Sequence, residues 1–152
     1  YWDDRIAVNL KHQFFAAQAV LPDMKAANAG VIVNFGSISW VAGQGGMAAY
    51  TASKSAVIGL TRSLARDYGP YNVRVNAIAP GIIISPMTMG LVDPNDAAAI
   101  EERRARYARN TKLGRPGEVD DIANAVLYLM SDASSFMTGQ VLHPNGGSIM
   151  AS

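Results

Sequence analysis

Apolar positions recur every three or four residues along the first part of the chain. This spacing predicts a helix over residues 2–29 with one apolar face, formed by Ile6, Leu10, Phe14, Ala17, Leu21 and Met24. Pro22 is expected to kink this helix or to end its main part, and Gly30 to stop it. The same period predicts a second long helix over 48–68, ended by Gly69-Pro70.

Short β-branched runs separate these helices. Residues 31–35, 73–78 and 140–143 are expected to be strands, and 36–46 a loop rich in Gly and Ser. Asp93-Pro94 resembles an N-cap followed by a first-turn proline and predicts a helix over 93–110; a further helix is expected over 116–130. The order of elements predicts an α/β fold, as one part of a Rossmann-type doubly wound parallel sheet.

Composition sets limits on the class of protein. The chain has 152 residues, 49% of them hydrophobic and 16% charged, which is typical of one globular domain. A net charge of +1 argues against nucleic acid as a partner, and no apolar run approaches the length of a membrane span. The absence of cysteine excludes disulfides and thiolate metal sites, and we expect a cytoplasmic protein. His12 and His143 lack companion ligands at a suitable spacing, so no metal site is expected.

Tyr50 and Lys54 are the strongest candidates for chemistry. Residues four apart on a helix share a face, so the phenol and the ammonium are expected to be neighbours. A nearby cation favours the phenolate, which makes such a tyrosine a plausible general acid and base. Taken alone, the pair is better explained as a surface aromatic beside a solvated lysine.

Three further features follow the strands or lie in the first helix. Ser37 comes directly after strand 31–35, where open α/β sheets place their ligands; it also fits a turn-forming serine. Pro80-Gly81 follows strand 73–78 and offers backbone groups to a planar amide, or is simply a turn. Asn9 lies inside the first helix and equally fits a solvated side chain.

Together these residues resemble a known pattern. Asn9, Ser37, Tyr50 and Lys54 are similar, in order and spacing, to the Asn-Ser-Tyr-Lys tetrad of the short-chain dehydrogenase/reductase family. The segments Tyr50–Leu64 and Arg74–Gly81 resemble its active-site helix and its cofactor loop, and Thr138–Gln140 with Gly146-Gly147 resemble its closing strand. The glycine-rich phosphate loop of the family is missing from the chain, which we therefore expect to be the carboxy-terminal part of a longer protein.

The resemblance implies a role for each matching residue. Tyr50 would exchange a proton with the substrate oxygen, Lys54 would assist Tyr50 and bind the nicotinamide ribose, and Ser37 would orient the substrate. Asn9 would hold a water molecule that relays protons from Lys54. Backbone groups of Pro80, Gly81 and Ile83, with the hydroxyl of Ser85, would bind the nicotinamide end of NAD or NADP. The implied reaction interconverts a secondary alcohol and a carbonyl.

Two groups of residues indicate different substrates. Ser39 and Trp40 resemble residues of some sugar dehydrogenases of the family, although Trp40 equally fits a packing role. Met87, Met89 and Leu91 would form an apolar wall, which favours a ketoacyl substrate instead. The resemblance also implies that helix 93–110 is a substrate lid; its arginines are expected to be a solvated face.

The family implies a homo-oligomer, a dimer or tetramer. Helices 2–29 and 48–68 would pack against a second copy, with Phe14, Phe15 and Leu64 as interface candidates. The alternative to an active enzyme is a non-catalytic remnant that oligomerises without turnover, and we expect the 152-residue chain alone to be inert.

Overall fold

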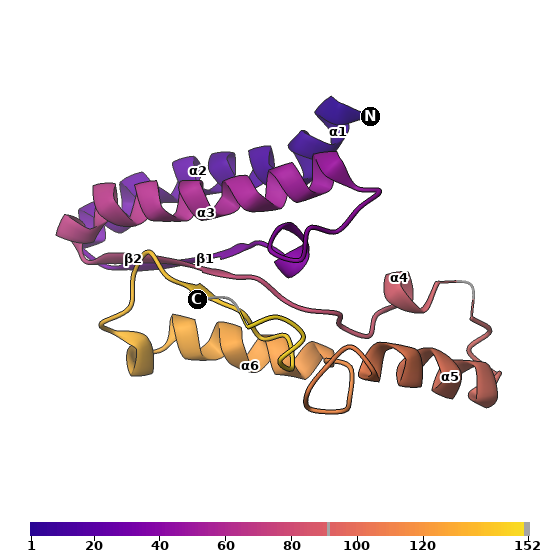
Figure 1. Ribbon diagram of the computed structural model, residues 1–152. Helices are drawn as coiled ribbons and strands as arrows, with labels where there is room; N and C mark the ends of the chain where they lie inside the picture. The colour runs from indigo at the N-terminus through magenta and orange to yellow at the C-terminus, as the bar shows by residue number, and fades with distance from the viewer. Residues whose placement is uncertain (91, 151–152) are drawn as a thin grey trace.

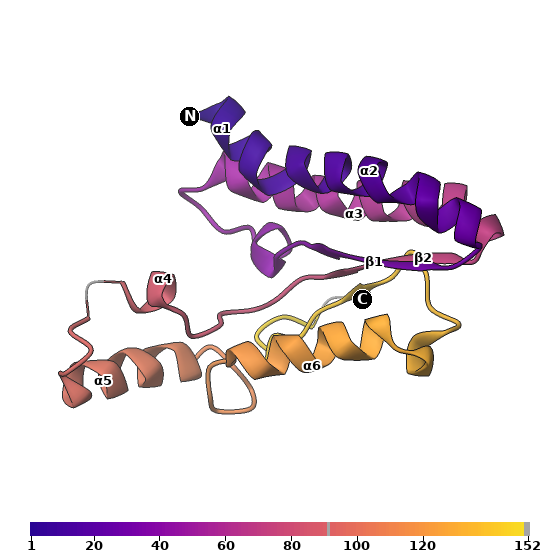
Figure 2. The ribbon, with the colours of Figure 1, turned by 180° about the vertical axis from the view of Figure 1, so that it is seen from behind.

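The computed structural model describes residues 1–90 and 92–150. Helices α2 and α3 cover one face of a small sheet and helix α6 lies on the other face (Figures 1 and 2). The helices are α1 (Trp2–Ile6), α2 (His12–Ala27), α3 (Ala48–Tyr68), α4 (Pro86–Met89), α5 (Ala97–Ala108) and α6 (Val119–Met130). Shorter helical segments are η1 (Ala7–Lys11), η2 (Ile38–Trp40), η3 (Gly69–Tyr71) and η4 (Asp132–Ser134). No helix in these described parts is both long and apolar enough to span a bilayer.

The sheet is parallel throughout and confirms the expected α/β class. Its strands are β1 (Gly30–Phe35), β2 (Val73–Ile78) and β3 (Val141–Leu142), in the order β1-β2-β3. Strand β1 pairs with β2 from Gly30 opposite Val73 to Phe35 opposite Ile78. Within the described residues, β1 is paired on its β2 side only.

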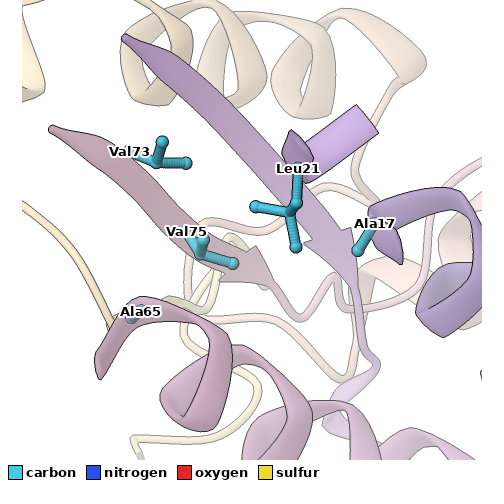
Figure 3. Close-up of a cluster of buried hydrophobic side chains, with 5 residues drawn as sticks. All are labelled: Ala17, Leu21, Ala65, Val73 and Val75. Atoms are coloured by element: carbon cyan, nitrogen blue, oxygen red, sulfur yellow. The ribbon is translucent and has the colours of Figure 1, made fainter. Parts of the chain in front are cut away.

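The main core fills the space between the sheet and the helices α2 and α3. Figure 3 shows Leu21 and Ala17 of α2 facing Val73 and Val75 of β2, with Ala65 of α3 beside them. These five side chains are between 0 and 6% exposed. Burial of such aliphatic groups fixes α2 and α3 against the strands whose carboxyl ends carry the candidate site.

Polar side chains on the opposite face of β2 attach the segment that follows α6. Arg74 donates to the carbonyl oxygen of Leu129 and to Ser134 Oγ, both at 2.9 Å. The fully buried Asn76 donates to the Met137 carbonyl oxygen at 2.8 Å and accepts from the Gln140 N–H at 3.0 Å. These bonds bring the chain back to the sheet, so that β3 can pair with the end of β2.

The first helix differs from its prediction in two ways. It is interrupted by η1, a π-helical turn that contains Asn9, and Pro22 neither ends α2 nor stops it before Ala27. Asn28, in the left-handed conformation with φ of 49°, caps α2. Phe14 was expected on the buried face, but it is 44% exposed while Gln13 is 8% exposed. Ala17 and Leu21 are buried as predicted, so the buried face differs from the prediction at this one position, where Gln13 takes the place of Phe14.

Three other boundaries were wrong. Helix α5 begins at Ala97, because Asp96 caps it by accepting from the Ala99 N–H at 2.9 Å, whereas Asp93 accepts from the Asn95 N–H in a preceding turn. Helix α6 begins at Val119 and not at 116, since Gly117 forms a parallel bridge with Ile83. Strand β3 is two residues long, and α4 was not predicted at all.

Candidate active site

The ends of the three strands meet at one edge of the sheet. Ser37 follows β1, Pro80-Gly81 follows β2, and Pro144 follows β3. The Ile38 N–H donates to the Pro80 carbonyl oxygen at 3.2 Å, and the Gly81 N–H donates to the Pro144 carbonyl oxygen at 3.1 Å. These two bonds join the loops that follow the strands and make the edge one continuous surface.

Tyr50 and Lys54 lie beside this edge, in the first two turns of α3. Lys54 Nζ is 5.7 Å from the centroid of the Tyr50 ring, so the predicted pair forms. The Lys54 side chain is buried, and its ammonium donates to the carbonyl oxygen of Phe35, the last residue of β1, at 3.0 Å. Burial lowers the pKa of Lys54 from its ordinary value, because the charged form loses hydration.

This burial predicts a pH-dependent stability effect of Lys54→Met. The unfolded lysine titrates near 10.5 and the folded one lower, so the cost of burying the charge is fully present at neutral pH. This cost falls as the pH rises through the folded pKa and vanishes above 10.5, where the lysine is neutral in both states. We expect the stability of the native chain to rise relative to Lys54→Met across that interval, measured by urea unfolding at neutral and alkaline pH. Lys112→Met, at an exposed lysine, is the control, and a pH-independent difference for Lys54→Met would contradict the assignment.

Asn9 lies in the π-helical turn, half-buried, and its side chain is not directed to Lys54. Asn9 Nδ2 donates to the Arg5 carbonyl oxygen at 2.9 Å, and the Asn9 carbonyl oxygen accepts from Gln13 Nε2, also at 2.9 Å. Gln13 Nε2 is also 3.2 Å from the Phe35 carbonyl oxygen. Asn9 is thus connected to the acceptor of Lys54 through Gln13, and the proton relay remains a prediction.

A cavity of about 310 Å³ lies over the strand ends. Ser37 and Ser39 both line it, together with Pro80 and Gly81. Ser37 Oγ accepts from the Ser39 N–H at 3.2 Å, and the buried Ser39 Oγ has no partner within residues 1–90 and 92–150. Tyr50 and Trp40 are absent from the described lining of this cavity, and Trp40 is 38% exposed.

The predicted cofactor loop is only partly free to bind a ligand. The Ile84 N–H and the Ile82 carbonyl oxygen both pair with Gly117, so the Ile83 N–H points to the other side of the chain. The Ile83 carbonyl oxygen accepts from Thr88 Oγ1 at 2.8 Å, and the Gly81 N–H is already bonded to Pro144. Ser85 caps α4 by accepting from the Thr88 N–H at 3.3 Å. The backbone N–H of Ile83 is therefore the donor best placed for a ligand.

Met87 was expected to form part of an apolar substrate wall, and that role stays a prediction. Its side chain is 87% exposed on α4, the helix that begins with the capping box of Ser85 and Thr88. Met89 is half-buried, and Leu91 lies outside the described residues. Tyr107 Oη donates to the Thr88 carbonyl oxygen at 2.7 Å and so connects α5 to α4; the lid role of this helix stays a prediction.

The interface candidates divide into two groups. Phe14 and Phe15 lie in an exposed apolar groove with Ala56 and Leu60 of α3. Leu64 is half-buried and packs against the core cluster, and its place in an interface stays a prediction.

Three residues of the site were missed by sequence reasoning. Gln13 falls between Leu10 and Ala17 on the helical period, and a polar residue at such a step is the signal that could have found it. Asn145 is 8% exposed, accepts from the Gly147 N–H at 2.8 Å and donates to the Ile149 carbonyl oxygen at 2.9 Å. The resulting turn places Ser148 in the cavity wall, which no local pattern indicates.

Comparisons with known proteins agree with this architecture. A family profile described as Enoyl-(Acyl carrier protein) reductase matches residues 1–148. The 3-oxoacyl-[acyl-carrier-protein] reductase FabG of Staphylococcus aureus (strain Mu50) is 41% identical over 98% of this chain and 57% of its own length. A Rhizobium meliloti protein, GalD, provisionally named a galactose dehydrogenase, is 41% identical over 96% of this chain and 55% of its own.

A solved structure shares the fold as well. A crystal structure from Sinorhizobium meliloti 1021, provisionally described as a short-chain alcohol dehydrogenase, superposes with a TM-score of 0.83 at 38% identity. The match covers 97% of this chain and 56% of that one, so the chain spans little more than half the length of the relatives it matches. These similarities agree with the arrangement of the strands and with the Tyr50–Lys54 pair at their ends. The chain belongs to the short-chain dehydrogenase/reductase family and corresponds to the carboxy-terminal portion of its members.

Proposed function

We propose that this chain supplies the proton-transfer and substrate-binding part of an NAD(P)-dependent oxidoreductase that interconverts a secondary alcohol and a carbonyl. The observation that carries the proposal is the pairing of Tyr50 with a buried Lys54 at the carboxyl edge of a parallel sheet. An ammonium held close to a phenol favours the phenolate, which is the form that takes a proton from an alcohol.

The residues present fit a nicotinamide cofactor, which supplies or accepts the hydride when it is bound. The Ile83 N–H faces away from Gly117 and is a donor for the carboxamide. Lys54 has three N–H groups, and one of them donates to the Phe35 carbonyl oxygen. Two N–H groups are then left for Tyr50 and a ribose hydroxyl. Ser37, on the wall of the cavity, is the hydroxyl that would orient the substrate oxygen. Asn9 would contribute through the carbonyl oxygen that Gln13 holds.

In the oxidative direction, Tyr50 accepts the hydroxyl proton of the alcohol at its phenolic oxygen. The positive charge of Lys54 favours the phenolate before the transfer. After the transfer, Lys54 keeps the phenol in the same orientation. Ser37 donates a hydrogen bond to the substrate oxygen and fixes its distance from Tyr50. The entropic cost of orienting the substrate is then met when it binds, which lowers the barrier of the proton transfer. In the reductive direction the same proton returns from Tyr50 to the new alkoxide.

The lining of the cavity favours a neutral, hydroxylated substrate. Five uncharged polar side chains line it, and none of its described lining residues is ionisable: Ser37, Ser39, Gln44, Asn110 and Ser148. The hydroxyls of Ser39 and Ser148 are buried and have no partner in the described ranges, at a cost of about 1–3 kcal/mol each. Hydroxyls of a neutral sugar or polyol would relieve that cost once these serines rotate, whereas a carboxylate would meet no counter-charge.

The test is nicotinamide-dependent turnover by the product of the complete reading frame that contains these residues. Neutral sugars, polyols, a sugar acid and a ketoacyl ester are assayed with NAD(H) and NADP(H). Turnover of the neutral polyhydroxylated compounds is expected, and Ser148→Ala should lower kcat/KM for them about tenfold. Ser63→Ala, at an exposed serine of α3, should change nothing. Preference for the ketoacyl ester, unaffected by Ser148→Ala, would overturn the substrate class; cofactor binding without any turnover would favour the non-catalytic alternative.

A second copy of the chain is the partner that the apolar groove on α2 and α3 suits best. Phe14 and Phe15, 44% and 49% exposed, meet edge to face with ring centroids 5.3 Å apart. Exposed aromatic pairs of this kind favour an interface.

A further inference from the structure

Tyr107 is a half-buried residue to which the proposed mechanism gives no role. It lies in the last turn of α5, and its Oη donates to the carbonyl oxygen of Thr88 in α4 at 2.7 Å. The two helices lie beyond the end of β2 (Figure 1), and within the described residues they pack little against each other. The hydrogen bond of Tyr107 is therefore a principal connection between α5 and α4.

Thr88 also orders the loop that we assign to the nicotinamide cofactor. Its hydroxyl donates to the Ile83 carbonyl oxygen and accepts from the Ser85 N–H, both at 2.8 Å. These bonds fix the backbone of the loop and with it the direction of the Ile83 N–H. Thr88 thus holds the cofactor loop through its hydroxyl and Tyr107 through its carbonyl oxygen.

Tyr107 is joined in the other direction to the wall of the substrate cavity. Asn110, which lines the cavity, comes three residues later, and its N–H donates to the Tyr107 carbonyl oxygen at 3.1 Å. The N–H groups of Lys112 and Leu113 then donate to the Gly146 carbonyl oxygen, at 2.8 and 3.2 Å. Asn110 therefore lies between two anchors, one on α4 and one on the turn that follows β3.

The two anchors depend on different parts of the molecule. The Gly146 anchor belongs to the turn after β3, whereas the Tyr107 anchor depends on α4 and so on the cofactor loop. A cofactor that binds the Ile83 N–H favours the arrangement in which Thr88 holds the loop, because a ligand shifts a conformational equilibrium towards the state that it binds better. The same arrangement offers the Thr88 carbonyl oxygen to Tyr107 and keeps Asn110 in the cavity wall.

We propose that Tyr107 is a positioning residue that couples the cofactor loop to the substrate cavity, acting through Asn110. The inference rests on the proposed function, because it requires a cofactor at residues 83–85 and a substrate in the cavity. A neutral hydrogen bond of this kind changes an equilibrium about fivefold. Binding of the cofactor should therefore strengthen binding of the substrate by about this factor, and binding of the substrate should strengthen that of the cofactor equally.

The first test is amide hydrogen exchange in the product of the complete reading frame, with and without NADH or NADPH. In the native protein the cofactor is expected to slow exchange of the Asn110 N–H about fivefold, whereas in Tyr107→Phe, which lacks only the phenolic oxygen, it should have little effect. Tyr68→Phe, at a half-buried tyrosine at the far end of α3, is the control and should behave as the native protein. Equal slowing in the native protein and Tyr107→Phe, or none in the native protein, would overturn the inference.

Steady-state kinetics separates positioning from a general structural effect. For the neutral polyol that the native protein turns over, Tyr107→Phe should raise KM about fivefold and leave kcat within about twofold, since Tyr50 and Lys54 are untouched. In an Asn110→Ala background, Tyr107→Phe should raise KM no further, because the amide that it positions is gone. An equal rise in both backgrounds, or a native KM for Tyr107→Phe, would contradict the proposal.

Thr88→Val replaces Tyr107→Phe if that variant fails to fold. Valine keeps the backbone carbonyl oxygen but cannot hold the Ile83 carbonyl, so the effect of the cofactor on the Asn110 N–H should again be lost. Retention of that effect would count against the coupling. A native protein that binds neither NADH nor NADPH would refute the proposed function and this inference with it, whereas turnover of polyols without the coupling would refute the inference alone.

Discussion

Replacing Tyr50 by phenylalanine should lower kcat for alcohol oxidation about a thousandfold while leaving the fold intact. The variant loses only the phenolic oxygen, and general acid–base groups contribute about 10²–10⁴-fold to rates. Tyr50 is half-buried in the first turn of α3, and its ring can keep its packing as phenylalanine. Binding of NAD(H) or NADP(H) should change little, because the remaining groups that we assign to the cofactor, Lys54 and the Ile83 N–H, are unaltered.

Tyr68→Phe is the matched control, because Tyr68 is the last residue of the same helix and packs against the core. It should retain native turnover, and thermal unfolding of both variants should match that of the native protein. Retention of more than about a tenth of native kcat by Tyr50→Phe would show that another group moves the proton. Loss of kcat together with loss of cofactor binding would show that Tyr50 has a binding role beyond acid–base chemistry.

Local signals explain which elements could be predicted from the sequence. Helix 48–68 and strand 73–78 match α3 and β2 to the residue, because Gly69-Pro70 terminates one and a β-branched run defines the other. The start of α6 was misplaced because Gly117 pairs with Ile83, a partner more than thirty residues away that no local pattern reveals. At α5 two aspartates compete as caps, and only the backbone geometry shows that Asp96 is the cap while Asp93 forms a turn.

The candidate site divides in the same way. Tyr50 and Lys54 could be paired from their spacing, since four residues is one helical turn. Lys54 donates to the backbone carbonyl oxygen of Phe35, 19 residues earlier in the chain. Gln13, a further 22 residues earlier, donates to the same oxygen. Backbone acceptors carry no sequence signature, so neither contact was predicted. The exposure of Met87 was not predicted either, because α4 and its capping box at Ser85 and Thr88 were not expected from the sequence.

Gly81→Ala is expected to impair both stability and turnover, because Gly81 meets Asn145 more closely than any side chain allows. A Cβ at position 81 would lie 2.8 Å from both Cα and Cβ of Asn145, where backbone and not a flexible side-chain end must move. Such overpacking typically costs about 1–3 kcal/mol of stability. Asn145 also forms the turn that places Ser148 and Ile149 in the cavity wall, so its displacement carries that wall away from Ser37.

We therefore expect Gly81→Ala to reduce kcat/KM about a hundredfold, the loss that follows from misplacing a reacting group by about 1 Å. Gly59→Ala is the matched control with the opposite sign: Gly59 lies on the exposed side of α3 and its Cβ would meet nothing within 4 Å. Alanine there should raise the free energy of unfolding by about 0.5–1 kcal/mol and leave turnover unchanged. Urea unfolding of the two variants tests the predicted changes in stability, and steady-state kinetics tests the predicted changes in kcat/KM. Native kinetics for Gly81→Ala would mean that the loops after β2 and β3 separate without disturbing the cavity, and that the substrate does not depend on the wall that Asn145 builds.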